Sequence, residues 1–490
     1  MAIDFTRYQK PGVYIENIGG PQLSVRSSVP TAVALFGQAI GYRTFTESIT
    51  INPDVDADTP AMNKTLTQKG IKSSTVKVVN PNSGQVYVVG TDYVVTRVNA
   101  GEDATVNTRD DTYTIQRVID GGHIDPGDII QVSYNYTDPS YFEVYAFYDY
   151  DDVRDMYGDP FDASGNIQSE LSLCAKFAFI NGASTVLTCA VDPENPDSVT
   201  MADYADALDK FRDEEQIAII VPCTGAQAIQ ALVLQHVTAQ SNNKFERMSI
   251  IGMDGSITPV QSSTRIANAQ ALGTNGGERI ALISPSNFTY YAPELNAPIV
   301  VGGQYMAAAV AGKAVSMNAA MPLTRKSISG FVGPAEVMRE GLKNLESSQG
   351  LMVVEKTRRQ QVQVRHGVTT NPTDLNTREW SIIRQGDVMV YRIRDYLDAD
   401  GLIGMPIYDE TIVQVKASAE AALTSLVTDE VIRGYQNLKA RQIGIHPDVI
   451  EVRYEWRPAY PLNYIVVRYS IAVETGDITV SGDNTVNGGL

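Results

Sequence analysis

The chain has 490 residues, 43% of them hydrophobic, and a formal net charge of −18 at pH 7. This length and apolar content exceed a single ordinary core, so two or three domains are expected. The charge argues against a nucleic-acid footprint on the whole chain. The longest apolar runs are far shorter than a bilayer span, and the first residues carry no signal-peptide core. We therefore expect a soluble protein, made in the cytoplasm, with no nucleic-acid binding and no direct membrane insertion.

The first predicted element is a short strand near the N-terminus. Val13 and Ile15 alternate with Tyr14 and Glu16, with Ile18 just beyond, and Pro-Gly segments punctuate both sides. An isolated strand buries too little surface to hold itself. We expect either a disordered terminus or a strand that adds to an open sheet edge, in its own chain or in another copy.

An acidic, strand-rich region follows a buried strand. Residues 31–37 form a near-continuous apolar run, which is typical of a strand buried on both faces. Residues 46–160 carry 19 acidic and 8 basic residues, more than half of the net negative charge, which favours a solvated outward face. Five β-branched and aromatic runs there predict an all-β sandwich or small barrel inserted into another domain. These runs are residues 75–79, 85–89, 93–98, 112–118 and 129–136.

From about residue 151 to 345, short apolar runs alternate with helical stretches. This βαβ series predicts a parallel or mixed sheet covered by helices. The strands are expected at residues 184–191, 217–221, 248–252 and 279–283, and helices at 201–214 and 226–240. In the second helix Ile229, Leu232, Val233 and His236 share one face. Residues 302–315 are rich in Ala and Gly, which predicts a helix packed closely against a neighbour.

The last section predicts a mixture of strands and one long helix. Strands are expected at residues 351–356, 361–364, 449–456 and 463–473. A helix is expected at residues 418–438, containing Arg433 and followed by Lys439 and Arg441, where cations suit the helix dipole. The tail from residue 475 onward is polar and Gly-rich except for Ile478, Thr479 and Val480.

Candidates for catalysis and metal binding are few. Of the four histidines, His236 lies on the apolar side of a predicted helix and His366 has no Cys or Glu at metal-ligand spacing; His123 and His446 sit beside turn residues. No GxSxG elbow, Walker A or HExxH motif occurs. Cys174, Cys189 and Cys223 form no CxxC pair and lie in apolar segments, which favours core residues over disulfides. We predict no catalytic residue, no metal and no cofactor.

Several aspartates lie close together near the end of the all-β region. Asp149, Asp151, Asp152 and Asp155 could bind a cation, because carboxylate oxygens suit calcium. The cluster lacks the ordered spacing of an EF-hand, so we interpret it as a solvated charge run.

Four segments, in chain order, resemble the tail sheath proteins of contractile-tailed bacteriophages and related contractile injection machines. They are residues 11–16, 362–370, 380–384 and 457–465. The resemblance covers almost the whole chain and implies a multidomain α+β fold. It implies an exchange arm at 1–24, a subtilisin-like α/β domain without a triad at 25–45 and 151–345, an acidic all-β insertion at 46–150, a C-terminal α+β domain facing the tube at 346–474, and an exchange tail at 475–490.

The resemblance implies a mechanical function and no enzyme activity. Copies of the chain would form stacked hexameric rings around a tail tube and contract to drive that tube through the host envelope. The baseplate and tail terminator proteins would be further partners, in a virion tail assembled in the host cytoplasm. We expect strand exchange through two sets of residues, Val13, Tyr14, Ile15, Glu16 and Ile18 in the arm and Ile478, Thr479 and Val480 in the tail. Arg433, Lys439 and Arg441 are candidate tube contacts, with a plain surface helix as the alternative.

Two other functions remain open at the level of the sequence. A serine hydrolase of subtilisin-like fold needs a serine beside a histidine that a carboxylate orients, and its α/β segment contains only His236. Labelling of one serine by a phosphonate probe would support it. A β-sandwich adhesin or carbohydrate-binding protein explains residues 46–150 but not the other domains, and glycan binding without tube formation would support it.

Overall fold

The computed structural model describes residues 29–39, 42–51, 64–98, 111–193, 199–253, 255, 260–274 and 276–469. The chain divides into two compact units, Met1–Tyr460 and Pro461–Leu490, and each is described by itself. Within the described ranges, no helix is both long enough and apolar enough to span a bilayer.

The largest sheet has eight strands. Its six inner strands run parallel, and an antiparallel strand closes each edge, which confirms the prediction of a βαβ series. In spatial order the strands are β18 (Val362–Val364), β17 (Leu351–Lys356), β13 (Ile280–Ser284), β12 (Met248–Ile251), β11 (Ile217–Pro222), β1 (Ala32–Gly37), β10 (Val186–Ala190) and β9 (Tyr145–Phe147). β17 and β18, which the sequence grouped with the C-terminal section, extend this sheet.

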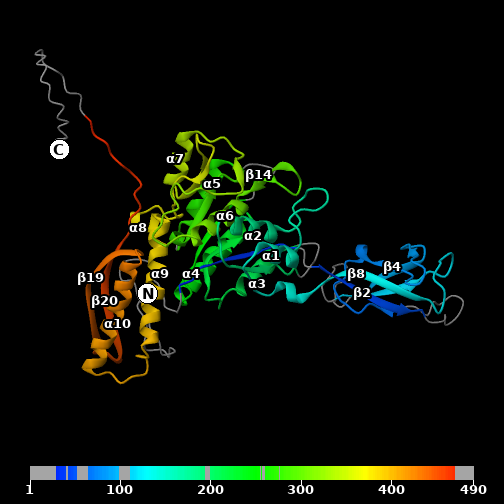
Figure 1. Ribbon diagram of the computed structural model, residues 1–490, viewed down its shortest axis with the longest axis horizontal. Helices are drawn as coiled ribbons and strands as arrows, with labels where there is room; N and C mark the ends of the chain where they lie inside the picture. Colours follow the sequence, from blue (N-terminus) through cyan, green and yellow to red (C-terminus); the bar gives the residue numbers. More distant parts are fainter. Residues whose placement is uncertain are drawn as a thin grey trace, which may run out of the picture. The chain divides into compact units, whose positions relative to one another are not determined.

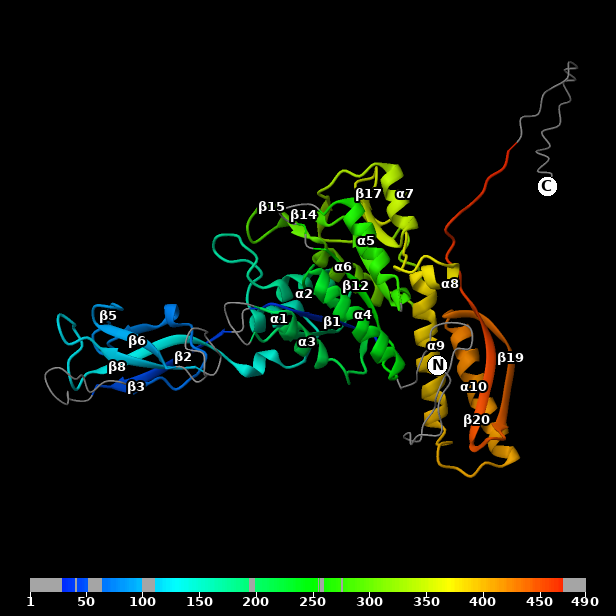
Figure 2. The same ribbon diagram turned by 180° about the vertical axis from the view of Figure 1, so that it is seen from behind.

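Helices cover both faces of this sheet (Figures 1 and 2). Val33 and Leu35 of β1 belong to one apolar cluster, whereas Ala34 and Phe36 belong to another, so β1 is buried on both sides as predicted. On the first face lie α1 (Tyr150–Tyr157), α2 (Glu170–Ile180) and α6 (Gly303–Val315). On the second lie α3 (Met201–Asp209), α4 (Gln227–Asn242) and α5 (Ser262–Leu272), with α7 (Glu340–Ser348) beside β17 and α5.

The Ala- and Gly-rich helix α6 packs closely on α2, as its composition predicts. A Cβ atom placed on Gly312 would lie 2.2 Å from the carbonyl oxygen of Ala178. No side chain larger than hydrogen fits between the two helices at this point, so the glycine sets their separation.

Strands β2–β8 form two smaller sheets with an apolar core of their own, which includes Ile49, Val78, Ile115 and Tyr134. The first sheet contains, in spatial order, β2 (Tyr42–Thr50), β8 (Ile129–Thr137), β4 (Lys77–Val79) and β5 (Val86–Tyr87). The second contains β3 (Lys64–Thr65), β7 (Thr112–Arg117) and β6 (Tyr93–Val98). The strands predicted between residues 75 and 136 are therefore confirmed in number and approximate position.

A further sheet of β15 (Ala297–Gly302), β14 (Asn287–Ala292) and β16 (Phe331–Pro334) lies next to α6.

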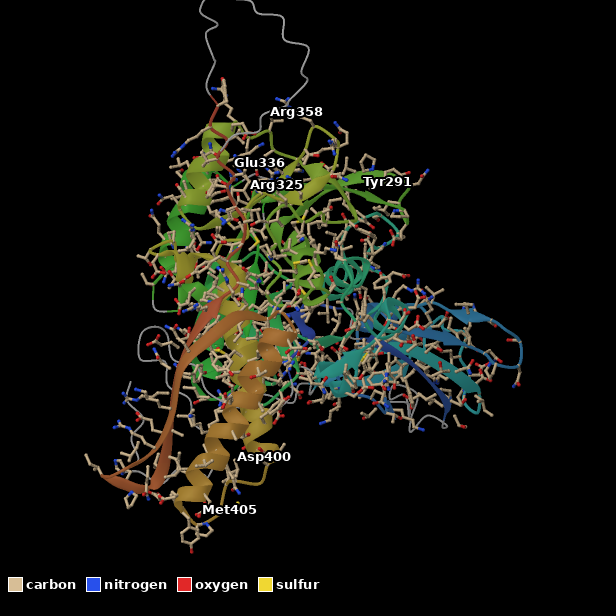
Figure 3. All side chains as sticks on the ribbon, turned by 60° about the vertical axis from the view of Figure 1, so that its left-hand side comes forward. Tyr291, Arg325, Glu336, Arg358, Asp400 and Met405 are labelled. Carbon is tan, nitrogen blue, oxygen red and sulfur yellow. The ribbon has the colours of Figure 1, made fainter. Side chains whose placement is uncertain are left out.

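The C-terminal section differs from the prediction. It contains α8 (Leu375–Arg378), α9 (Trp380–Ala399), α10 (Asp409–Thr428) and a hairpin of β19 (Ile432–Ile443) and β20 (His446–Pro458). The helix expected at residues 418–438 is wrong in its second half, because α10 ends at Thr428 and Glu430 then adopts a positive φ of 56°. Figure 3 shows the α9–α10 connection, marked by Asp400 and Met405, at the same end as the hairpin turn.

The second unit begins with an extended apolar segment. Residues 461–469 form neither helix nor strand, so the strand expected at 463–473 is wrong over its described part, and residues 470–473 lie outside the described ranges. Six large side chains of this segment are each at least 76% exposed: Leu462, Tyr464, Ile465, Val466, Val467 and Tyr469. A run of this apolar content normally needs a partner surface.

Candidate functional site

The β19–β20 hairpin has one face covered by its own chain. Tyr435 lies opposite Trp456 in the hairpin register, and both rings contact the apolar cluster that α9 and α10 form. The Tyr435 hydroxyl is 3.0 Å from Oγ1 of Thr424 on α10. A two-stranded sheet is marginal alone, so α10 supplies the support that this hairpin needs.

Both edges of the hairpin are open in the part of the chain that the structure describes. β19 pairs only with β20, and β20 only with β19. Alternate residues of an antiparallel pair direct their N–H and C=O groups away from the partner strand. Two rows of backbone donors and acceptors therefore flank the hairpin, and either row can pair with an extended segment.

The exposed face of the hairpin is mostly basic. Lys439 lies opposite Arg453, and Arg441 lies opposite Glu451, so these four side chains share one face. Nε of Arg441 is 2.7 Å, and Nη2 of Arg453 2.6 Å, from the Glu451 carboxylate. The hydrogen bond from Arg453 has the larger effect, and together the two bonds hold the pKa of Glu451 below its usual range.

The three predicted tube-contact residues lie on a strand, which corrects the expectation of a helix end. Lys439 and Arg441 are brought together on the exposed face of β19. Arg433 is also exposed, but it lies within one register shift of β19, and a second shift separates it from Lys439 and Arg441. The second shift spans Asn437, whose φ is 60°. At this shift β19 has one residue more than β20 between the two paired positions, and an extra residue of this kind bends a strand locally.

Helix α9 fixes the point at which the chain leaves the hairpin. The side-chain amide of Gln385 donates to the Ala459 carbonyl at 3.1 Å and accepts from the Ala459 N–H at 2.8 Å. Gln385 is fully buried. The Tyr460 hydroxyl adds a contact of 3.1 Å to Oδ1 of Asn376. The last residues of the first unit are therefore anchored, although the apolar segment after them is exposed.

Buried ion pairs join α9 to the eight-stranded sheet. Arg279, just before β13, donates two hydrogen bonds of 3.1 and 3.0 Å to the Asp387 carboxylate. Arg394 lies 3.3 Å from both carboxylate oxygens of Glu246, just before β12. Burial raises the pKa of Glu246 to about 7 and lowers that of Arg394 to about 10. The hairpin is thus tied to the sheet through charged groups that water does not reach.

No sequence pattern had indicated α9 as a structural joint. The prediction used only its first residues, 380–384, as part of a motif. One signal was available: charged and aromatic residues recur at helical spacing along one face of α9, at Arg384, Asp387, Tyr391 and Arg394. Met389, Ile393 and Leu397 of the same helix belong to the apolar cluster. Charges at core positions weaken that periodicity.

The expected exchange residues of both termini lie outside the described ranges. They are Val13, Tyr14, Ile15, Glu16 and Ile18 in the arm and Ile478, Thr479 and Val480 in the tail. Their strand pairing stays a prediction.

The geometry around the histidines gives no support to hydrolase chemistry. Nε2 of His236 is 3.2 Å from Nη1 of Arg247, and burial together with this cation lowers the pKa of His236 to about 3. His366 instead pairs with Glu379 at 3.0 Å. In the described part of the chain, neither ring has a serine as hydrogen-bond partner. Among the described residues, the partner of His236, the one histidine of the predicted hydrolase segment, is an arginine and not the carboxylate that would orient a catalytic base.

The remaining candidates are structural. Asp149 caps α1, accepting from the Asp151 N–H at 2.7 Å, and Arg154 lies near Asp151, Asp155 and Asp159. Among the described residues, no cluster of three or more His, Cys, Asp or Glu side chains could hold a metal ion. Cys174, Cys189 and Cys223 are buried free thiols.

In the part of the chain that the structure describes, the open hairpin edges and the exposed apolar segment suit a protein that assembles with other chains. Residues 197–370 match the family model described as the phage tail sheath protein central domain. The tail sheath protein of Mycobacterium phage Bxz1 is 60% identical, over 99% of this chain and 100% of that relative. The chain belongs to the phage tail sheath protein family, which is structural and not enzymatic.

Solved structures share the fold at low identity. A chain of the anti-feeding prophage baseplate, in a 6-fold symmetrised structure, has a TM-score of 0.55 and 12% identity, over 95% of this chain and 100% of that one. A chain of the anti-feeding prophage helical sheath in the contracted state has a TM-score of 0.53 and 12% identity, over 95% and 99%. The mixed α/β architecture is therefore one that contractile sheath structures also have.

Proposed function

We propose that copies of this chain polymerise as stacked hexameric rings around a tail tube, and that the polymer contracts to drive the tube through the host cell envelope. Family membership supports this role, and one structure of the same fold is a helical sheath in its contracted state. Contraction needs no nucleotide here. Its free energy would come from contacts that the contracted array makes and the extended array lacks, in a kinetically trapped two-state system.

The observation that carries the proposal is that the described part of one chain holds both a hairpin with open edges and an exposed apolar segment. The β19–β20 hairpin has two open edges, and residues 462–469 expose six large apolar side chains. We propose that these residues, with Ile478, Thr479 and Val480 beyond them, add to the hairpin of one neighbouring copy. The arm residues Val13, Tyr14, Ile15, Glu16 and Ile18 add to another.

The strength of this pairing suits a lattice that must slide without separating. A backbone hydrogen bond contributes about 0.5–1.5 kcal/mol net, so a four-residue pairing contributes on the order of a few kcal/mol. Repeated at every subunit, the pairing becomes a continuous mesh. Connectors such as residues 19–21 and 475–476 would let the domain bodies rotate while the exchanged strands persist.

The proposed domains follow the sequence boundaries with one change. We propose an exchange arm at 1–24, an inserted all-β domain at 46–150 and an exchange tail at 475–490. The core would be a subtilisin-like α/β domain from 25–45 and 151–345, and the pairing of β17 with β13 and of β18 with β17 supports its extension to residue 364. The C-terminal domain, first expected at 346–474, would then begin after this sheet. The acidic all-β domain would project outward, where repulsion between copies helps to keep the extended lattice open.

We propose that the basic hairpin face contacts the tail tube. Lys439 and Arg441 share this face with Arg453, and Arg433 is exposed on the same strand. Acidic groups on the tube are the expected partners. Because exposed ion pairs are individually weak, many repeated copies of this contact are needed to template assembly.

The proposed partners are further copies of the chain, the tube, the baseplate and a tail terminator. The fold shared with a chain of a solved baseplate supports the baseplate contact. Assembly would take place in the host cytoplasm and the product would be a virion tail. This function includes no nucleic-acid contact and no membrane insertion.

Deletion of residues 1–18 tests the proposal. The truncated chain should remain a soluble, folded monomer that cannot polymerise, because the described core begins beyond the deleted arm. Electron microscopy of the full chain and of the truncated chain, prepared under the same conditions, measures this. Tubes of normal length from the truncated chain would refute arm exchange.

A further inference from the structure

A small cavity lies where α9 meets the eight-stranded sheet. Arg384, Asp387 and Tyr391 of α9 line it, together with Glu246 and Met248 from the start of β12. All five residues are buried. The cavity has a volume of about 10 Å³. This is room for one water molecule or one monatomic ion.

Among the described polar side chains that line this cavity, Arg384, the last residue of the motif at 380–384, has no hydrogen-bond partner. It is only 8% exposed, and its Nε atom is buried without a hydrogen-bond partner. Its guanidinium group makes no hydrogen bond or ion pair with any residue that the structure describes. Burial lowers the pKa of Arg384 to about 10, and the charge of Asp387 only partly opposes this.

The neighbouring arginines are compensated. Arg279 pairs with Asp387, and Arg394 pairs with Glu246, so each carboxylate at the cavity already lies within an ion pair. Arg247 donates to the backbone carbonyls of Phe245, Phe211 and Glu214. Among the described residues that line the cavity, no carboxylate is left to pair with Arg384, so its positive charge is in excess. Protonation of Glu246, whose pKa is raised to about 7, would only increase that excess.

A water molecule would satisfy the Nε–H group but not the charge. Burying an uncompensated cation is costly, and the cost falls when a counter-charge enters the same site. We propose that this cavity binds a monatomic anion, chloride in ordinary solutions, held by the Arg384 guanidinium at the joint between α9 and β12. The anion would stabilise the docking of α9, and thus of the hairpin that α9 supports. The inference concerns the folded single chain and does not depend on the proposed assembly.

Crystals of the full chain grown with bromide in place of chloride give the direct test. Bromide scatters anomalously, so a peak in the cavity next to Arg384 is the expected result. A cavity that contains only water, with no anomalous peak when bromide is the sole halide in the crystal, would overturn the proposal.

Thermal unfolding gives a matched test in solution. Replacing potassium gluconate by potassium chloride at equal ionic strength should raise the midpoint by about 1–3 °C in a saturable manner. The difference should vanish in Arg384→Met, which removes the charge, and persist in Arg359→Gln, an exposed arginine that controls for general salt effects. The same chloride dependence in Arg384→Met as in the unchanged chain would contradict the proposal. If Arg384→Met does not fold, the bromide measurement on the unchanged chain decides.

Discussion

Strands β1 and β20 belong to the same chain but have opposite surroundings. β1 pairs with β10 on one side and β11 on the other, and its six residues are all buried. Among the described strands, β20 pairs with β19 alone, and it keeps exposed residues along most of its length. β1 has a neighbour on each side, whereas β20 has an open edge in the described part of the chain. This difference supports our proposal that the hairpin, and not the eight-stranded sheet, pairs with other copies.

The largest effect on stability should come from the buried joint that holds the hairpin to the complete sheet. Asp387→Ala leaves Arg279 buried without its carboxylate, so we expect a loss of about 3–5 kcal/mol in the free energy of unfolding. Chemical denaturation measures it. Asp429→Ala is the matched control, because its pair with Arg392 is half-exposed and should contribute no more than about 1 kcal/mol. Equal losses in both variants would show that the joint is not the support we infer.

A smaller loss is expected at the end of β20. Gln385→Ala removes both hydrogen bonds to Ala459, and the unpaired backbone groups should cost about 1–3 kcal/mol. Hydrogen exchange should become faster at the end of β20 while β1 stays protected. Gln270→Ala, at an exposed glutamine that pairs only with Gln349, should change neither. Unchanged exchange in Gln385→Ala would mean that the hairpin end is held by other contacts.

The exposed tail segment should matter for assembly and hardly at all for stability. Val467→Asp places a charge on a side chain that is 78% exposed, so the unfolding free energy should change by less than about 0.5 kcal/mol. Polymerisation should fail, because the apolar segment could no longer pack against a neighbour. Val86→Asp is the control, because the Val86 side chain on β5 is comparably exposed; this variant should polymerise normally. Normal tubes from Val467→Asp would exclude residues 462–469 as an exchanged strand.

The smallest effect is expected on the basic face of the hairpin. Reversing Arg433 and Lys439 together to glutamate should shorten sheaths assembled on tubes and leave monomer folding unchanged, because both side chains are exposed. Reversing Lys64 and Lys77, which are exposed in the small sheets, is the control. Sheath length by electron microscopy is the readout. Equal lengths in both double variants would reject the tube contact.

The regions that the sequence predicted well are those whose pattern comes from burial. β1 and β11 are continuous apolar runs with six buried residues each, so their type and position were clear. The first part of β19, residues 432–438, was wrongly predicted as the end of a helix, because Arg433, Gln436 and Leu438 are residue types that favour helices. Its conformation is decided instead by pairing with β20 and by the contact of Tyr435 with α10.

Long-range pairing explains the other differences. α9 buries Arg384, Asp387 and Arg394. No sequence pattern shows that Arg279, just before β13, and Glu246, just before β12, pair with two of them. Residues 463–469 have the composition of a strand but are assigned to no strand, because composition does not show whether such a run finds a pairing partner.

A map of the assembled polymer at side-chain resolution tests strand exchange most directly. Our proposal predicts an added strand on each free edge of the β19–β20 hairpin, and that tracing these strands leads to two different neighbouring copies. Bare hairpin edges, or edges covered by the termini of the same copy, would contradict it.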